Sequence, residues 1–236
     1  MDRHEAKRRA AIAAAEFVRD GMTVGLGTGS TAELMVEELG RRVREGLAIR
    51  GVPTSQRTAE LAQRLRIPLV ELEAAPVLDV TIDGADEITA DGSAIKGGGG
   101  ALCREKVVAA ATAGTRIAVV DPAKLVERLG AFPLPVEVVP FARAPLARWI
   151  GELGGRAAAR LSEGKLVVTD NGNHILDCRF GPREDWPEIA RRLDALPGLV
   201  CHGLFWQCFD VIVVGREGGA EVQRIARPAG HRFPAV

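Results

Sequence analysis

Charged residues at close spacing mark residues 83–106, DGADEITADGSAIKGGGGALCREK, as the stretch best equipped for chemistry. Two carboxylates, Asp83 and Asp86, lie three residues apart, and Lys96 opens a run of four glycines. A charged triplet follows at 104–106. Neither a core strand nor a surface helix needs this combination, so we interpret the stretch as a ligand site.

The glycine run has two interpretations. Glycine-rich segments are usually flexible linkers, but this one lies between an expected strand at 93–95 and an expected helix at 101–113 that ends at Gly114. Glycine lets backbone N–H groups approach an anionic ligand closely, and a helix start adds partial positive charge. The lysine and acids on either side favour an anion-binding loop.

A buried strand is predicted at 77–82, directly before Asp83. In open α/β sheets, ligands bind beyond the carboxyl ends of the strands, which places Asp83 and Asp86 where chemistry occurs. The alternatives are a solvated turn or a calcium loop. A calcium loop needs acids at alternate positions and a terminal glutamate, and this stretch lacks both.

A second anion site is predicted at 27–31, GTGST, between an expected strand at 22–26 and an amphipathic helix. The motif is not a Walker loop, which requires GK[ST], nor a dinucleotide fingerprint, because Ser30 replaces the third glycine. A sugar phosphate or mononucleotide fits better. The structural alternative is a tight turn with Ser30 or Thr31 as the helix N-cap.

The alternation of strands and helices predicts an α/β fold with a Rossmann-like, mostly parallel sheet. Further strands are expected at 47–52 and 116–120. Parallel strands then bring four polar loops to one edge of the sheet, at 27–31, 53–55, 83–86 and 121–124.

A smaller ferredoxin-like α+β domain is expected at 131–203, inserted into a catalytic domain formed by 1–130 plus 204–236. Asn171-Gly172 is a strong hairpin-turn signal. The β-α-β-β-α-β order is assembled from a strand at 132–139, a helix at 145–153, a hairpin at 167–176, a helix at 187–196 and a strand at 199–205.

Composition indicates a soluble cytoplasmic protein. Lys plus Arg and Asp plus Glu both total 31, so the formal net charge is zero and does not favour binding to nucleic acid or membrane. The longest uncharged run, 195–209, is shorter than the roughly 18 apolar residues of a membrane span. Acids at Glu5 and Glu16 do not suit a targeting peptide. The four cysteines form no C-x-x-C pair, which favours reduced thiols and no metal site.

Five motifs occur in order along the chain: GLGTGSTA (25–32), IDGADEI (82–88), KGGGGALCREK (96–106), DPAK (121–124) and FPLPVEV (132–138). Together they resemble type A ribose-5-phosphate isomerase, over nearly the whole chain up to residue 228. The resemblance implies a homodimeric or homotetrameric intramolecular oxidoreductase of the non-oxidative pentose phosphate pathway. It also implies that the protein interconverts D-ribose 5-phosphate and D-ribulose 5-phosphate without metal or organic cofactor.

The resemblance implies that Glu105 is the general base. A single carboxylate can move the proton between two carbons through an enediolate, and Lys96 is the nearest cation in sequence for the oxyanion. Asp83 or Asp86 is expected to assist ring opening, and the residue types do not distinguish them. Cys103 neighbours the site without a catalytic role in the family. The implied substrate contacts are Thr28, Gly29, Ser30, Thr31, Asp83, Gly84, Ala85, Asp86, Lys96, Gly97, Gly98, Gly99 and Lys124.

Two other functions are compatible with such a fold. A sugar-phosphate sensor would need an output domain, and the sequence contains no basic recognition helix. A coenzyme A transferase of similar architecture would use a glutamate as nucleophile and would depend on an acyl-CoA.

Overall fold

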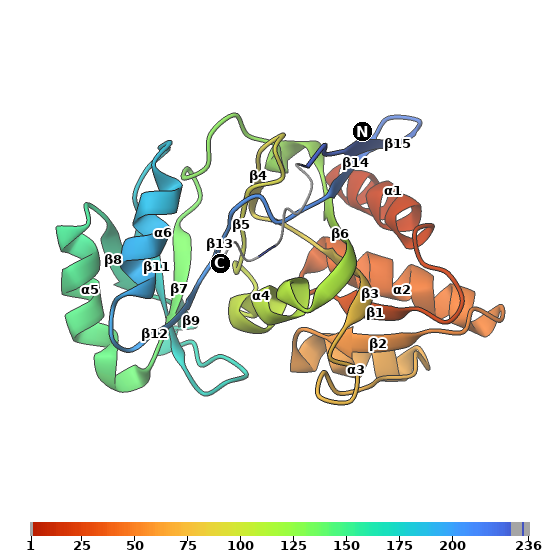
Figure 1. Ribbon diagram of the computed structural model, residues 1–236, viewed down its shortest axis with the longest axis horizontal. Helices are drawn as coiled ribbons and strands as arrows, with labels where there is room; N and C mark the ends of the chain where they lie inside the picture. Colours follow the sequence, from red (N-terminus) through yellow and green to blue (C-terminus); the bar gives the residue numbers. More distant parts are fainter. Residues whose placement is uncertain (1, 228–232, 234–236) are drawn as a thin grey trace.

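The computed structural model describes residues 2–227 and 233, which fold around two main sheets lying side by side (Figure 1). The larger sheet has six strands in the order β15-β14-β6-β3-β1-β2. Neighbouring strands are parallel except β14 and β15, so the expected mostly parallel α/β sheet is confirmed. The strands are β1 (Thr23–Leu26), β2 (Arg50–Pro53), β3 (Leu78–Asp83), β6 (Thr112–Val120), β14 (Val211–Arg216) and β15 (Gly219–Arg224).

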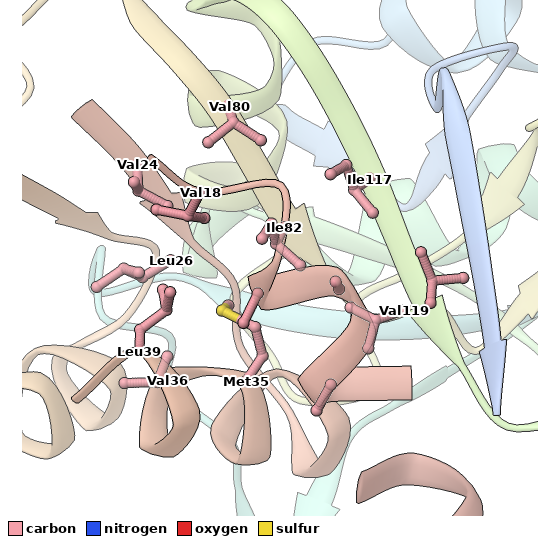
Figure 2. Close-up of a cluster of buried hydrophobic side chains, with 14 of the residues drawn as sticks. Val18, Val24, Leu26, Met35, Val36, Leu39, Val80, Ile82, Ile117 and Val119 are labelled. Carbon is pink, nitrogen blue, oxygen red and sulfur yellow. The ribbon is translucent and has the colours of Figure 1, made fainter. Parts of the chain in front are cut away.

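Helices cover both faces of this sheet. On one face, α1 (Arg3–Ala15), α2 (Ser30–Arg44) and α3 (Gln56–Arg64) contribute to a large apolar core, which Figure 2 shows in close-up. On the other face, α4 (Leu102–Ala110) packs against β3 and β6. The labelled core residues in Figure 2 are Val18, Val24, Leu26, Met35, Val36, Leu39, Val80, Ile82, Ile117 and Val119.

The parallel direction of β1, β2, β3 and β6 fixes where polar loops gather. Each of these strands ends in one of the loops 27–31, 53–55, 83–86 and 121–124, and the last contains the short 3-10 helix η1 (Pro122–Lys124). The prediction that these loops share one edge of the sheet is confirmed.

The second sheet has four antiparallel strands in the order β12-β7-β11-β8, with α5 (Arg143–Glu152) and α6 (Trp186–Asp194) supplying its apolar core. This order is that of a ferredoxin-like β-α-β-β-α-β unit. The strands are β7 (Leu134–Val138), β8 (Arg156–Ala159), β11 (His174–Arg179) and β12 (Leu199–His202), and the 3-10 helix η2 (Pro140–Ala142) precedes α5. The assignment of 131–203 to a separate domain stays a prediction.

The second strand of this unit is not where the sequence suggested. Gly172 does form the turn, with φ of +79° and its N–H on the carbonyl of Thr169 at 2.9 Å. Before that turn, however, only Val168 bridges to His174, and the partner of β11 is β8. The sequence of β8, RAAA, has no β-branched or aromatic residue, so it lacked the usual strand signal. The two short strands β9 (Leu161–Ser162) and β10 (Lys165–Leu166) pair between β8 and the turn.

The helix expected at 101–113 ends earlier, at Ala110, because β6 already begins at Thr112. Gly114 therefore lies within a strand. A Cβ at this position would stand 1.7 Å from the carbonyl oxygen of Asp79, beside the register shift between Leu78 and Val80. Gly114 allows two strands to approach closely at a bulge, and it does not terminate a helix.

The strand expected at 199–205 is divided at Gly203. Its second half, β13 (Leu204–Phe205), leaves the small sheet and pairs with β5 (Ala94–Ile95), which in turn pairs with β4 (Glu87–Ile88). Gly203 donates its N–H to Pro135 at 2.7 Å and accepts from the N–H of Lys96 at 2.8 Å. Through these two hydrogen bonds, Gly203 connects the backbone of Lys96 to β7 of the small sheet.

Of residues 229–236, for which the sequence predicts no role, only Phe233 lies within the described residues. Its ring stacks on Phe205 with centroids 5.9 Å apart. Among the described helices, none has the length and apolarity required to cross a membrane.

Candidate active site

A polar pocket opens at the shared carboxyl edge of β1, β3 and β6. It contains every sequence-predicted site residue except Asp83, which is buried and in contact with Lys96 of the pocket wall. The pocket is lined by Arg3, Lys7, Thr28, Gly29, Ser30, Thr31, Gly84, Ala85, Asp86, Lys96, Gly97, Gly98, Gly99, Glu105 and Lys124.

Lys96 is the centre of this site. Its Nζ lies 3.1 Å from Oδ2 of Asp83 and 3.4 Å from Oε2 of Glu105, and it donates to the carbonyl of Gly84 at 2.5 Å. The Lys96 ammonium also lies 5.5 Å from the centre of the Phe205 ring. The three charged side chains come from three segments, namely the end of β3, the residue after β5, and the first turn of α4.

Burial controls the protonation of these groups. Asp83, Lys96 and Glu105 are 2%, 3% and 3% exposed. Burial, followed by the negative charge of Asp83, raises the pKa of Glu105 to about 8, although Lys96 opposes the shift. Burial alone would lower the pKa of Lys96, but the charges of Asp83 and Glu105 outweigh it and raise that pKa. A carboxyl that titrates near neutrality beside a fixed cation is suited to proton transfer.

Asp83 is held in place by backbone groups as well as by Lys96. Its Oδ1 accepts the N–H of Gly84 at 2.7 Å and that of Thr28 at 3.2 Å. A Cβ at position 27 would come within 2.3 Å of the same oxygen, so Gly27 is required for this close approach. Asp83 therefore links the loop after β1 to Lys96.

Asp86 occupies a different part of the pocket. Its Oδ2 accepts the N–H of Gly98 at 2.7 Å, and a Cβ at Gly98 would stand 2.5 Å from Oδ1. Asp86 thus fixes the glycine loop, whereas Asp83 contacts Lys96. The two acids that the sequence could not distinguish have separate positions.

The loop at 27–31 forms the other end of the pocket, where α2 begins at Ser30. The N-cap is Gly29, with φ of +118° and no side-chain cap bond, so the alternative of Ser30 or Thr31 as N-cap is wrong. The N-terminus of α2 is consequently uncapped by a side chain and suited to an anion. A hydroxyl cluster around Thr28 Oγ1 supports the loop, with Thr54 at 2.7 Å, Ser55 at 2.8 Å and Thr58 at 3.1 Å.

Two pocket cations were not predicted. Lys7 and Arg3, one helical turn apart on α1, line the pocket beside Ser30 and Lys124. Lys7 donates to Oγ of Ser30 at 2.8 Å, and Arg3 pairs with Asp121 at 3.0 Å. Their spacing was the only available signal, and it is common on solvent-exposed helix faces.

The two charged residues next to Glu105 in the sequence make contacts outside the pocket. Arg104 donates to Oδ1 of Asn171 at 2.9 Å, and Lys106 donates to the carbonyl of His202 at 2.6 Å. Cys103 is half-buried and lies outside this pocket. Within residues 2–227 and 233, no three His, Cys, Asp or Glu side chains gather as a possible metal site.

Comparisons with known proteins agree with this geometry. The family model for ribose 5-phosphate isomerase A (phosphoriboisomerase A) matches residues 50–219. The chain is 47% identical to ribose-5-phosphate isomerase A of Parvibaculum lavamentivorans over 229 residues, covering 94% of this chain and 99% of the relative. It is 50% identical to that of Streptococcus gordonii over 217 residues, covering 92% and 96%.

Solved structures give the same result. Ribose 5-phosphate isomerase A from Methanocaldococcus jannaschii superimposes with a TM-score of 0.87 at 41% identity, covering 92% of this chain and 97% of that one. A D-ribose-5-phosphate isomerase in complex with phospho-erythronic acid superimposes with a TM-score of 0.91 at 36% identity, covering 95% and 100%. The chain belongs to the ribose 5-phosphate isomerase A family.

Proposed function

We propose that this protein interconverts D-ribose 5-phosphate and D-ribulose 5-phosphate through an enediolate, with no metal or organic cofactor, in the non-oxidative pentose phosphate pathway. The observation that carries the proposal is the position of Lys96 between Asp83 and Glu105, in the same pocket as residues 28–31 of the loop after β1. A proton-transfer centre and an anion site thus share one cavity. Family membership and the identity to named isomerases support the same activity.

The phosphate would bind at the start of α2. Backbone N–H groups of the loop, the hydroxyls of Ser30 and Thr31, and the ammonium of Lys7 all line this end. The carbonyl end of the sugar would then lie toward Lys96 and Glu105. A related enzyme binds phospho-erythronic acid, which carries a phosphate at one end and a carboxylate at the other. Such an acid matches a pocket that has Lys7 beside Ser30 at one end and Lys96 at the other.

Isomerisation begins once the sugar is in its open form, and Asp83 and Asp86 are the candidates for assisting ring opening. In the open aldose, the Glu105 carboxylate removes the proton from C2. The C2–H electron pair forms the C1–C2 double bond, and the carbonyl pair moves to O1. Lys96 stabilises the resulting oxyanion. The O2 proton passes to O1 and protonated Glu105 returns its proton to C1, which leaves a carbonyl at C2.

One assay tests this function directly. Purified protein is incubated with ribose 5-phosphate and ketose formation is followed, with and without prior exhaustive chelation. We expect ribulose 5-phosphate to form at the same rate in both samples, because Lys96 supplies the charge that a metal would otherwise provide. Absence of ketose in the untreated sample would refute the isomerase function. Loss of turnover on chelation, restored by one divalent ion, would refute only the metal-free mechanism.

The assembly and compartment are part of the same proposal. We propose a homodimer or homotetramer in the cytoplasm, with no nucleic-acid or membrane partner. Phe141 is 96% exposed, and a second subunit that covered its ring would remove this apolar surface from water. The four cysteines are free thiols, as expected in a reducing compartment. Sedimentation of the purified protein tests the assembly, and a monomeric mass would contradict it.

A further inference from the structure

Arg160 connects the small sheet to the glycine loop of the pocket. It follows β8 directly, and its Nη1 donates to the carbonyl oxygens of Gly97 at 2.7 Å and Gly98 at 3.1 Å. Its Nε and Nη2 donate to the two carboxylate oxygens of Asp177 on β11, at 3.0 and 2.5 Å. The guanidinium is therefore a fixed fork with a carboxylate on one side and two peptide carbonyls on the other.

Arg160 does not line the pocket, but Gly97, Gly98 and Gly99 do. In a planar trans peptide, the C=O and the following N–H point in opposite directions. With the carbonyls of Gly97 and Gly98 directed at Arg160, the N–H groups of Gly98 and Gly99 must point away from it. The Gly98 N–H behaves accordingly, since it donates to the pocket residue Asp86 at 2.7 Å.

The N–H of Gly99 is the second donor oriented in this way. Hydrogen bonds within the described part of the chain include no acceptor for it. Within the loop, Gly100 donates its N–H to the carbonyl of Gly97 at 3.0 Å, and Arg160 adds a second donor to that carbonyl and a donor to the carbonyl of Gly98. These contacts restrain a segment in which Gly97 and Gly100 have φ of +102° and +85° and in which glycine has little conformational preference of its own. A cation on the carbonyl side also polarises each peptide and strengthens its N–H as a donor.

We propose that Arg160 is a positioning residue for the isomerisation. It holds two peptide groups of the glycine loop so that the Gly99 N–H, in the pocket with Lys96 and Glu105, meets the oxygen that becomes negatively charged in the enediolate. This inference rests on the proposed function. Asp177 keeps the guanidinium in its orientation, and Arg160 thereby makes catalysis at the large sheet depend on the packing of the small one.

The test replaces Arg160 by Met, which keeps the aliphatic stem and removes the donors. Arg156, an exposed residue on the adjoining strand β8, provides the control Arg156→Met. We measure kcat and KM for ribose 5-phosphate, together with inhibition by phospho-erythronic acid and by inorganic phosphate. A merely structural role would weaken both inhibitors to the same extent.

For Arg160→Met we expect kcat to fall by roughly 10- to 100-fold with KM within about threefold, as for loss of a donor to a developing oxyanion. Inhibition by phospho-erythronic acid should weaken by a similar factor, while inhibition by phosphate stays unchanged. Arg156→Met should match the parent. Arg160→Lys keeps a cation but cannot contact both carbonyls and Asp177 together, so its kcat should be intermediate.

Two results would overturn the inference. One is a kcat for Arg160→Met within about twofold of the parent, and the other is equal weakening of both inhibitors. If Arg160→Met does not fold, the same criteria apply to Arg160→Lys, and parental kcat in that variant would overturn the inference. A parent protein without isomerase activity refutes the proposed function instead, so the two failures are distinguishable.

Discussion

Nζ of Lys96 lies 3.4 Å from Oε2 of Glu105, and each of these side chains is only 3% exposed. Lys96 is also 3.1 Å from Asp83, so one cation is shared between two buried carboxylates. This sharing leaves Glu105 incompletely neutralised. The arrangement accounts for a carboxyl that releases its proton near neutral pH and can take a proton back during the reaction.

The pH dependence of kcat/KM follows from this sharing. Burial and the charge of Asp83 raise the pKa of Glu105 to about 8 in the free protein. A general base must be ionised, so activity should fall about tenfold per pH unit below that pKa and level off above it. Initial rates at low substrate from pH 5 to 9.5 measure this profile. A flat profile through neutrality would mean that Glu105 does not titrate there.

Stability should depend on pH through the same residue. The folded-state pKa of Glu105 is raised above its ordinary value of 4.5 to about 8. The contribution of protonated Glu105 to the free energy of unfolding is therefore fully present at low pH and is lost as pH rises through the folded-state pKa. Glu105→Gln removes this loss. The Tm of the variant minus the Tm of the parent should therefore be larger at pH 8.5 than at pH 5.5. Thermal unfolding at both pH values tests the sign, and a constant Tm difference would contradict it.

Replacing Ser30 and Thr31 together by Ala should raise KM for ribose 5-phosphate about tenfold or more, with kcat changed little. Phosphate contacts are made equally in the bound substrate and in the transition state, so their loss appears in KM. Steady-state kinetics separate the two constants. If kcat falls while KM holds, the phosphate lies elsewhere in the pocket.

Asp83→Asn should slow turnover of the cyclic sugar phosphate more than that of an open-chain analogue, if Asp83 transfers a proton during ring opening. Asp86→Asn tests the other candidate for ring opening: Asp86 holds the N–H of Gly98, so if it only positions the glycine loop, its replacement should slow both substrates to the same extent. Equal losses on both substrates for Asp83→Asn would show that Asp83 instead positions Lys96.

The sheet edge was predictable from sequence because its signals are local. The buried strand that ends at Asp83 and the strand that ends before Gly27 can each be recognised from about ten consecutive residues. Parallel connections then place their loops together. The glycine run was identifiable for the same reason, since its residues lie in a single short segment. Glu105 was assigned through the resemblance to the isomerase family.

The remaining site residues depend on tertiary contacts that no local pattern encodes. Lys7 reaches Ser30 across 23 positions, and Arg160 reaches Gly97 across 63. Gly114 looked like a helix end because the sequence does not show that Asp79 approaches it on the next strand. Such contacts are set by how helices and sheets pack, which periodicity alone does not specify.

We propose that Glu105 moves the proton between C1 and C2, and Glu105→Gln tests this role most directly because the shape is kept and the base is removed. A favourable acid at a helix start would contribute at most about 1 kcal/mol to stability and nothing to catalysis. Two quantities are measured: the steady-state kinetic constants, and the exchange of the substrate C2 hydrogen with solvent in deuterated water. We predict that kcat falls by roughly 10² to 10⁴, that substrate binding is largely retained, and that exchange is lost in parallel. Turnover and exchange within a few-fold of the parent would contradict this role for Glu105.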